Sequence, residues 1–186
     1  MSSPTPTYKA ILRKYETYSE SLQGYYADLP NLLNDGYGYE TLIGYMYIRL
    51  EQAQNRILYG GVVKVHRGAR DFVWRVVNKQ HVTRKGFLEL YQNIFGKKLD
   101  DNITGMIVDA EKVRDKIIHG KYVKDSEKRQ AICEILECSH ELNELVKKHA
   151  GFYPFGSMRG FKGRADHLDN RTTKWVLRGL GFGVKA

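Results

Sequence analysis

Residues 103–120 read ITGMIVDAEKVRDKIIHG, and the pattern of this stretch recurs along most of the chain. Its apolar side chains are spaced three and four residues apart, as on one face of an α-helix. Gly120 follows the last apolar turn, where glycine commonly stops a helix. The stretch therefore predicts an amphipathic helix over residues 103–119. Its apolar face consists of Ile103, Met106, Ile107, Ala110, Val113 and Ile117.

The same periodicity predicts helices along the rest of the first 150 residues. One helix is expected from Tyr8 to just before Pro30, with a loose tail at residues 1–7. Residues 62–65 are also compatible with a short strand, and Gly60-Gly61 either interrupts a helix or marks a close helix contact. No alternating strand-and-hairpin pattern occurs in the first 150 residues, so we expect an all-α fold, an antiparallel helical bundle. The other predicted helices are residues 39–59, 62–80, 83–95 and 125–149.

The composition of the chain changes after Ala150. Residues 151–186 contain seven Gly, six aromatic residues, and seven Lys or Arg against two Asp. We therefore predict an α-helical domain at 1–150 and a basic, aromatic, Gly-rich C-terminal arm at 151–186. A short helix is expected in the arm near residues 170–180, capped by Asp169 or Asn170. The arm either binds single-stranded RNA or packs its aromatic rings on the bundle or on a partner subunit.

The 186-residue chain is basic, with a formal net charge of +9 and a pI of about 9.4. Such a charge favours nucleic acid or an anionic membrane surface as a partner, although many small basic proteins bind neither. No apolar run approaches the roughly 20 residues that span a bilayer. Residues 1–6 lack the basic and apolar regions of a secretory signal. We therefore expect a soluble cytoplasmic protein without a membrane partner.

The cysteines and acidic residues show no metal-binding pattern. Cys133 and Cys138 are the only cysteines, and they lie five residues apart within a helical pattern. Two such cysteines fit neither a zinc site nor a disulfide framework, so we expect reduced thiols. No cluster of Asp, Glu and His has the spacing of metal ligands. We therefore expect no metal and no cofactor.

Arg114 and His119 combine residue types that suit phosphate chemistry. Arg is a permanent cation whose planar fork of donors matches phosphate oxygens, and His exchanges a proton near neutral pH. RNA can be cut when its 2′-hydroxyl attacks the adjacent phosphorus, which requires proton removal, proton donation and charge neutralisation. Asp115 lies four residues before His119 and could orient the imidazole. This combination favours metal-independent cleavage of RNA.

Helical geometry separates the side chains of Arg114 and His119. Residues five apart differ by about 140° around a helix, so Arg114 and His119 of one chain would not reach the same phosphate. A loosened helix end or a second copy could bring them together, and we therefore expect a symmetric homodimer with a shared cleft. Spacing alone is weak support, because Arg75 and His81 form a similar pair six residues apart.

These residues carry a resemblance to a known family. The motif Arg114-Asp115-Lys116-Ile117-Ile118-His119-Gly120 and the predicted helix after it resemble the HEPN superfamily (higher eukaryotes and prokaryotes nucleotide-binding). Its members are α-helical bundles whose motif is Arg, four to six residues and His, commonly with a polar residue after the Arg. Many are metal-independent endoribonucleases that act as dimers, and others only bind nucleotides or proteins. The resemblance covers about residues 40–149 and does not extend to the C-terminal arm.

The resemblance implies that Arg114 and His119 are catalytic and that Asp115 supports them. It further implies an endoribonuclease acting as a toxin or antiphage-defence effector, with an antitoxin or regulatory protein as a partner. The alternative is a non-catalytic RNA-binding or regulatory HEPN-like helical module. In that case His119 would bind the last carbonyls of its helix, and Arg114 would form a surface ion pair, for example with Glu111.

Basic residues outside the motif are candidates for contacts with single-stranded or loop RNA. Cations can follow the phosphate backbone, and aromatic rings can stack on bases. The competing interpretation is a solvated helix face. The candidate RNA-binding residues are Lys64, Arg67, Arg70, Arg75, Arg159, Lys162, Arg164 and Trp175.

Overall fold

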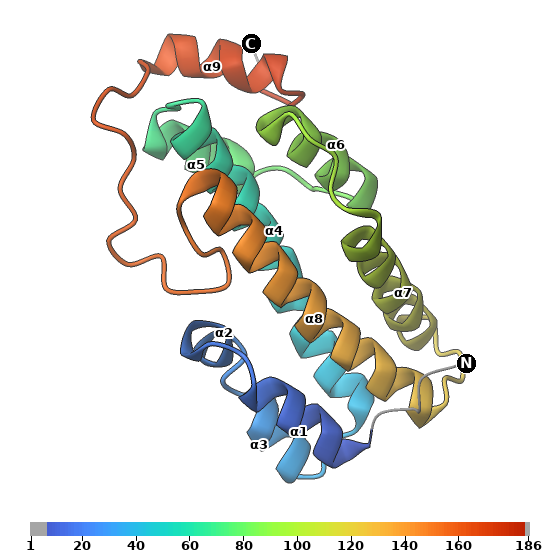
Figure 1. Ribbon diagram of the computed structural model, residues 1–186. Helices are drawn as coiled ribbons and strands as arrows, with labels where there is room; N and C mark the ends of the chain where they lie inside the picture. The colour runs from blue at the N-terminus through green and yellow to red at the C-terminus, as the bar shows by residue number, and fades with distance from the viewer. Residues whose placement is uncertain (1–6, 185–186) are drawn as a thin grey trace. The chain divides into compact units, whose positions relative to one another are not determined.

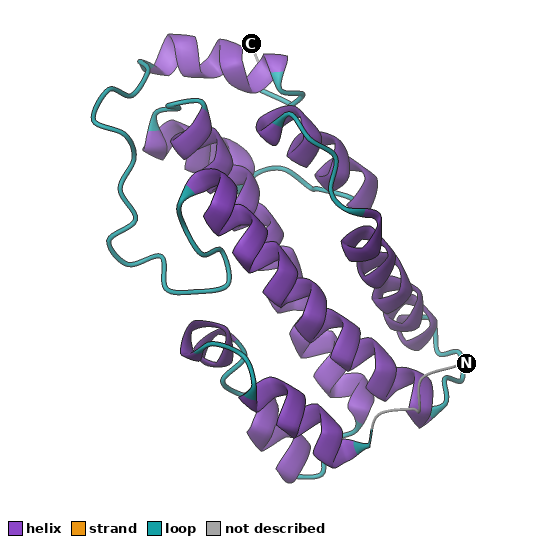
Figure 2. Cartoon of the chain, in the orientation of Figure 1, coloured by secondary structure: helices purple, strands orange, loops and turns teal. Residues whose placement is uncertain are grey.

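The computed structural model describes residues 7–184, which form α-helices joined by loops and turns (Figure 1). Figure 2 shows no β-strand in this part of the chain, so the predicted all-α fold is confirmed there. The predicted loose tail lies, apart from Thr7, outside the described residues. In chain order the helices are α1 (Tyr8–Glu16), α2 (Glu20–Tyr25), α3 (Leu29–Asn34), α4 (Tyr39–Val65), α5 (Arg70–Val77), α6 (Arg84–Phe95), α7 (Asp101–Ile118), α8 (Asp125–Ala150) and α9 (Asn170–Gly179).

The described residues divide into two compact units, and α4 and α8 contribute to both. The first unit contains the described part of Met1–Glu51 with Asp100–Asn143 and Phe155–Ser157. The second unit contains Gln52–Leu99, Glu144–Pro154 and the described part of the chain from Met158 onward. Each unit combines segments that are distant in sequence. The predicted boundary after residue 150 is a different division and stays a prediction.

The first unit buries the apolar sides of its helices around α4 and α8. In the core, the hydroxyls of Tyr26 and Ser139 share a hydrogen bond of 2.8 Å. Lys128 of α8 lies 2.7 Å from Glu40 of α4, which joins the first turns of these two helices. Burial of the apolar side chains provides most of the stabilisation of such a bundle. Buried members include Ile11, Leu29, Leu42, Met46, Leu50, Ile103, Ile107, Ala110, Ile132, Leu136 and Leu142.

Pro30 lies in the first turn of a helix, whereas the sequence led us to expect that a helix would end before it. The chain forms α1 and α2, separated by residues 17–19, and then α3 with Pro30 in its first turn. Ser19 interrupts the predicted single helix because its hydroxyl accepts a hydrogen bond from the Leu22 N–H and caps α2. Proline is tolerated in a first helical turn, since the N–H groups there have no helical acceptor.

In the second unit, α4 continues without a break through Gly60 and Gly61. A Cβ on Gly60 would lie 2.1 Å from the Phe152 ring, and a Cβ on Gly61 would lie 2.6 Å from Ile94. The glycines therefore mark close packing contacts, which was one of the two predicted alternatives. Residues 62–65 belong to the helix and form no strand.

The predicted caps of α6 and α9 are confirmed. The Thr83 hydroxyl accepts a hydrogen bond from the Gly86 N–H, and Gly96 ends α6 with φ of 68°. The Asp169 carboxylate accepts hydrogen bonds from two backbone N–H groups in the first turn of α9. These local signals determine both helix ends, as the sequence indicates.

The loop before α9 is attached to the connection between α4 and α5. The Leu168 N–H donates to the Arg67 carbonyl at 2.7 Å, and Arg67 pairs with Asp166 at 2.9 Å. The Thr173 hydroxyl, buried in α9, accepts a hydrogen bond from the Ala69 N–H at 3.0 Å. As a result α5 and α9 pack against each other, and the loop lies beside the start of α5.

The two cysteines are free and buried in α8. Burial raises the pKa of both the Cys133 and the Cys138 thiol. Both therefore stay protonated at neutral pH and serve as packing groups.

Candidate functional site

The C-terminal end of α7 carries the predicted motif and is closed by a glycine cap. His119 is the C-cap residue, and Gly120 follows with φ of 66°. The Lys121 N–H donates to the Lys116 carbonyl at 2.8 Å, and the Gly120 N–H donates to the Ile117 carbonyl at 3.0 Å. This pair of bonds is the Schellman arrangement, which satisfies carbonyls that the helix leaves without partners. Gly120 therefore has a structural role that is independent of any chemistry at His119.

Arg114 is held by three carboxylates of the first unit. Its Nη2 lies 3.0 Å from Asp115 and 3.7 Å from Glu111, and its Nη1 lies 3.5 Å from Glu51 of α4. Its guanidinium carbon stands 4.2 Å from the centroid of the Tyr47 ring, also on α4. The Arg114 side chain is 24% exposed. The guanidinium is thus fixed in place with one part still open to solvent.

The three carboxylates Glu51, Glu111 and Asp115, here called the carboxylate cluster, outnumber the single guanidinium. A phosphate approaching Arg114 would meet a net negative surrounding unless it displaced a carboxylate. The Arg114 Nε is buried and has no hydrogen-bond partner in the described residues. Burial, together with the Glu111 charge, raises the pKa of the Tyr47 phenol, so this ring stays neutral at physiological pH.

His119 does not join this cluster within one copy of the chain. Its side chain is exposed, and no hydrogen bond or ion pair of the imidazole occurs among residues 7–184. Its backbone N–H donates to the Asp115 carbonyl at 3.0 Å as part of the helix end. The structure therefore brings Arg114 and Asp115 together, and leaves His119 separate, as expected for residues five apart on a helix.

Two large apolar side chains flank His119. Ile118 is 66% exposed and Tyr122 is 86% exposed. Both side chains are therefore accessible close to His119 in the sequence.

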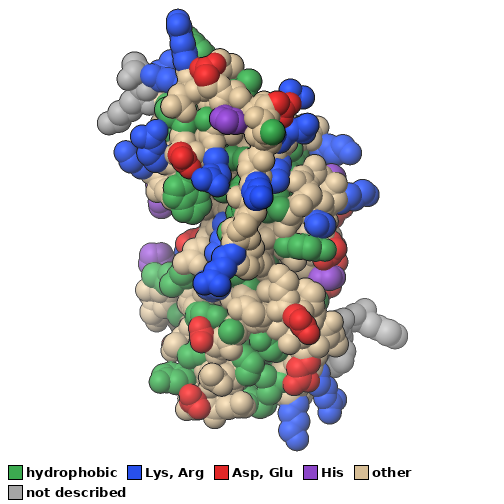
Figure 3. Space-filling model, turned by 90° about the vertical axis from the view of Figure 1, so that its left-hand side faces the viewer, with side chains coloured by type: hydrophobic (Ala, Val, Ile, Leu, Met, Phe, Trp, Pro, Cys, Tyr) green, Lys and Arg blue, Asp and Glu red, His purple; other side chains and the backbone are tan. Residues whose placement is uncertain are grey.

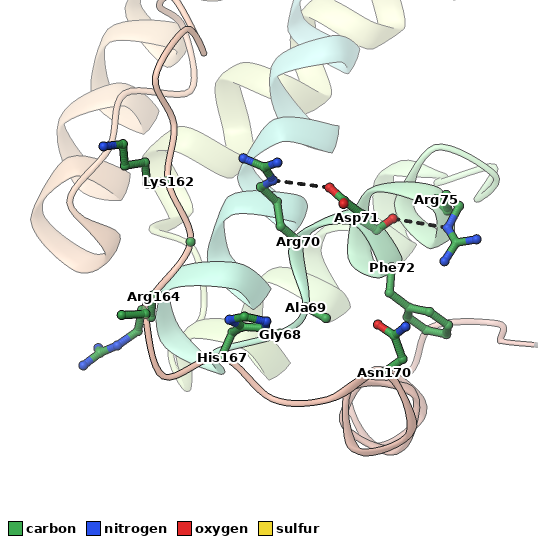
Figure 4. A pocket seen from close by; sticks show the side chains of 12 residues that line it. Gly68, Ala69, Arg70, Asp71, Phe72, Arg75, Lys162, Arg164, His167 and Asn170 are labelled. Atoms are coloured by element: carbon green, nitrogen blue, oxygen red, sulfur yellow. Dashed lines mark hydrogen bonds and ion pairs between the residues drawn. The ribbon is translucent and has the colours of Figure 1, made fainter.

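Four of the predicted RNA-binding residues line one pocket of the second unit, here called the basic pocket. Its volume is about 670 Å³. Figure 4 shows that Arg70 and Arg75 come from α5, whereas Lys162 and Arg164 come from the loop before α9. Asp71 is the one carboxylate in its lining. The remaining lining residues are Gly68, Ala69, Phe72, Gly163, Ala165, His167 and Asn170.

The other four predicted RNA-binding residues lie outside the lining of this pocket. Lys64 stands 5.0 Å from the centroid of the Phe161 ring, and Arg67 pairs with Asp166, so both have structural partners. Arg159 is exposed. Trp175 is 62% exposed on α9, with Arg178 beside its ring.

Sequence patterns missed several residues of both sites. Tyr47 and Glu51 are four residues apart in α4, a spacing that places them on one helix face, but nothing in the sequence pairs that face with Arg114. Phe72, His167 and Asn170 reach the basic pocket from segments about a hundred residues apart. The only sequence signal for the basic pocket was the clustering of basic residues near position 70 and near position 162.

The fold and these two sites define an all-α protein with a carboxylate-held arginine and a separate basic pocket. No protein-family model, curated protein or solved structure matches the chain. Within residues 7–184, no helix is both long enough and apolar enough to cross a bilayer. In the same residues, no group of three or more His, Cys, Asp or Glu side chains is placed to hold a metal ion.

Proposed function

We propose that this protein is a metal-independent endoribonuclease of the HEPN type, acting as a homodimer on single-stranded or loop RNA. The observation that carries the proposal is the exposed His119 imidazole, four residues beyond Asp115 of the Arg114–Asp115 pair. A general acid or base must reach its substrate, and an exposed histidine without a competing partner meets that need.

In the proposed reaction His119 takes the proton from the 2′-hydroxyl of one nucleotide. The 2′-oxygen then bonds to the neighbouring phosphorus, and the bond between phosphorus and the 5′-oxygen breaks. His119 of the second copy gives a proton to the leaving 5′-oxygen. The phosphate first replaces one of the carboxylates that pair with Arg114. Arg114 then offsets the negative charge on the phosphoryl oxygens. The products are a 2′,3′-cyclic phosphate and a 5′-hydroxyl.

A second copy is part of the proposal because one chain leaves Arg114 and His119 apart. A two-fold axis near the end of α7 would place two His119 side chains and two Arg114 side chains around one cleft. The exposed Ile118 and Tyr122 supply apolar surface for such a contact. The proposal further includes a cytoplasmic location and a toxin or defence role with an antitoxin or regulatory partner, which rest on the family resemblance.

A second candidate function is RNA binding without cleavage, and the carboxylate cluster favours it. Three carboxylates within 3.7 Å of the Arg114 guanidinium weaken it as a phosphate ligand. In this case the cations of the second unit bind RNA, and Arg114 fastens α7 to α4. This candidate predicts RNA binding that falls with salt and that persists in His119→Ala, since counterion release depends on Lys and Arg.

One experiment separates the two candidates. Purified wild-type protein, His119→Ala and the matched control His81→Ala are incubated with total RNA and transfer RNA in EDTA. We expect cleavage by the wild type and by His81→Ala, and cleavage at least about a hundredfold slower by His119→Ala, since general acid–base groups contribute that much. Equal cleavage by His119→Ala contradicts the proposed reaction, in which His119 moves the proton. Salt-dependent binding without cleavage by any of the three supports the second candidate.

A further inference from the structure

The basic pocket has the shape and the donors of a phosphate site. Its volume of about 670 Å³ lies in the range of pockets that hold nucleotide-sized ligands. Its two walls are the start of α5 and the loop before α9, which Figure 4 shows on opposite sides of the opening. On the face drawn in Figure 3, Lys and Arg side chains gather over the part that contains α5, α9 and this loop.

The arginines of the pocket retain most of their donors. Arg70 and Arg164 use Nε for ion pairs, with Asp71 at 3.3 Å and Asp166 at 3.4 Å. Arg75 uses Nε for the Asp71 carbonyl at 3.4 Å. Among the described residues, the Nη groups of these three arginines make no hydrogen bond. A guanidinium that is paired through Nε still presents two Nη groups, which suit the oxygens of a phosphate.

Two further groups add positive potential. Lys162 is exposed and has no hydrogen-bond or ion-pair partner in the described residues. No side chain caps the N-terminus of α5, so the first backbone N–H groups of this eight-residue helix remain available beside the pocket. The pocket lining has four cationic side chains and one carboxylate, Asp71, which pairs with Arg70, and Arg164 also pairs with Asp166 of the same loop.

The lining also offers groups that suit the rest of a nucleotide. Phe72 presents part of an aromatic ring, with Arg75 at 5.7 Å from its centroid. Asn170 contributes an amide that can both donate and accept hydrogen bonds, and His167 is an exposed residue of the lining. Rings and planar guanidinium groups stack on nucleobases, whereas amides bind their edges.

We propose that the basic pocket binds the phosphate of a ribonucleotide, with Lys162, Arg70 and Arg164 as its main ligands. The ribonucleotide is either free in solution or part of a single RNA strand, because both present the same phosphate and base. This site lies in the second unit and is separate from Arg114 and His119, so it holds whether or not the protein cleaves RNA.

The test is a fluorescence titration of the full chain, because its two tryptophans, Trp74 and Trp175, lie on the helices α5 and α9 that flank the pocket. The probes are a short 2′-O-methylated oligouridylate, uridine monophosphate and inorganic phosphate. The methylated strand lacks the attacking hydroxyl, so binding is measured without cleavage. Wild type is compared with Lys162→Glu and Arg70→Glu, and with Lys85→Glu as the control. Lys85 is an exposed residue of α6 outside the pocket lining, and its change alters the net charge equally.

We expect Lys162→Glu and Arg70→Glu each to weaken binding at least about tenfold, because each loses a charge-assisted contact, and Lys85→Glu to change it less than about twofold. Competition by uridine monophosphate at a concentration similar to that of the strand identifies a free or terminal nucleotide. Binding of the strand alone identifies internal phosphates. Equal weakening by all three variants, unchanged binding in the pocket variants, or no binding of any probe to the wild type overturns the proposal. Thermal unfolding of each variant confirms that these exposed substitutions leave the fold intact.

Discussion

The guanidinium carbon of Arg114 in α7 lies 4.2 Å from the centroid of the Tyr47 ring in α4. Glu51, one turn further along α4, lies 3.5 Å from the same guanidinium. Tyr47 and Glu51, on one face of α4, therefore both orient Arg114 of α7. Both also interact with its positive charge, Tyr47 through its ring and Glu51 through its carboxylate. If Arg114 contacts RNA, the acids that hold it also limit its affinity for phosphate.

Removing one of these acids should strengthen the action on RNA. We predict that Glu51→Gln raises kcat/KM for RNA cleavage about two- to fivefold, since a partly exposed ion pair contributes up to about 1 kcal/mol. The control is Glu144→Gln, an exposed residue of α8 with the same change of charge, which should have less effect. A lower kcat/KM in Glu51→Gln would instead assign Glu51 a positioning role for Arg114.

The proposed dimer predicts no complementation between two inactive variants, because one cleft uses the His119 side chains of both copies. Arg114→Ala and His119→Ala should each abolish cleavage alone. A mixed dimer of the two keeps a single His119 and lacks either the base or the acid, so an equimolar mixture should stay inactive. The measurement is cleavage after the two variants are mixed and allowed to exchange subunits, with mixed dimers demonstrated by mass spectrometry. Recovery of about a quarter of the wild-type activity would contradict the shared cleft, because it would show that one His119 and one Arg114 make a complete site.

Gly120 should matter for stability and not for the chemical step. Its φ of 66° disfavours a side chain, so Gly120→Ala should lower the free energy of unfolding by about 1 kcal/mol. The matched control is Gly105→Ala in the same helix, where a Cβ meets no atom within 4 Å. That change should stabilise the protein by about 0.5–1 kcal/mol. Urea unfolding gives both values, and cleavage per folded molecule should stay unchanged in both variants.

Helix ends with a local chemical cause could be predicted from the sequence. Thr83 and Gly96 limit α6, and Asp169 starts α9, because each acts through its own side chain or its own backbone conformation. The helix boundaries of the N-terminal region were predicted wrongly, because the local signal at Pro30 is ambiguous. Proline lacks an N–H, which suits the first turn of a helix as well as the position after its end, so Pro30 alone does not distinguish the two.

The candidate sites could be predicted only in part, because their composition depends on contacts between distant segments. The motif identified Arg114, Asp115 and His119, but Glu51 reaches Arg114 across 63 positions of the sequence. The basic pocket joins α5 to a loop about ninety residues later. Charge and composition indicated cations in both segments, and only the packing of α9 on α5 brings them to one pocket.

The close contact at Gly60 predicts a large cost for a small substitution. Gly60→Ala places a methyl group 2.1 Å from the Phe152 ring, which is itself buried. Such overpacking should lower the free energy of unfolding by about 1–3 kcal/mol. Gly44→Ala is the control in the same helix, since a Cβ there meets nothing within 4 Å, and it should be neutral or stabilising. Similar unfolding midpoints for the two variants would show that the Phe152 contact is not maintained in solution.

The cap of α9 predicts a stability contribution that depends on pH. Hydrogen bonds from Thr172, first from its hydroxyl, lower the pKa of the Asp169 carboxyl in the folded protein. A depressed folded pKa stabilises the fold above the unfolded pKa, and this stabilisation is lost as pH falls through the folded value. Asp169→Ala should therefore reduce the thermal midpoint at neutral pH. The difference from wild type should shrink in acid, and a difference independent of pH would exclude a role for the charged carboxylate.

The most direct measurement of the central claim is the chemistry of the RNA ends. RNA is incubated with wild-type protein in EDTA, and the fragments are analysed by mass spectrometry beside those from His119→Ala. We predict 2′,3′-cyclic phosphate and 5′-hydroxyl ends with the wild type only, because the 2′-hydroxyl is the nucleophile and His119 moves the proton. Fragments ending in 3′-hydroxyl and 5′-phosphate, or equal amounts of cyclic phosphate from His119→Ala, would contradict it.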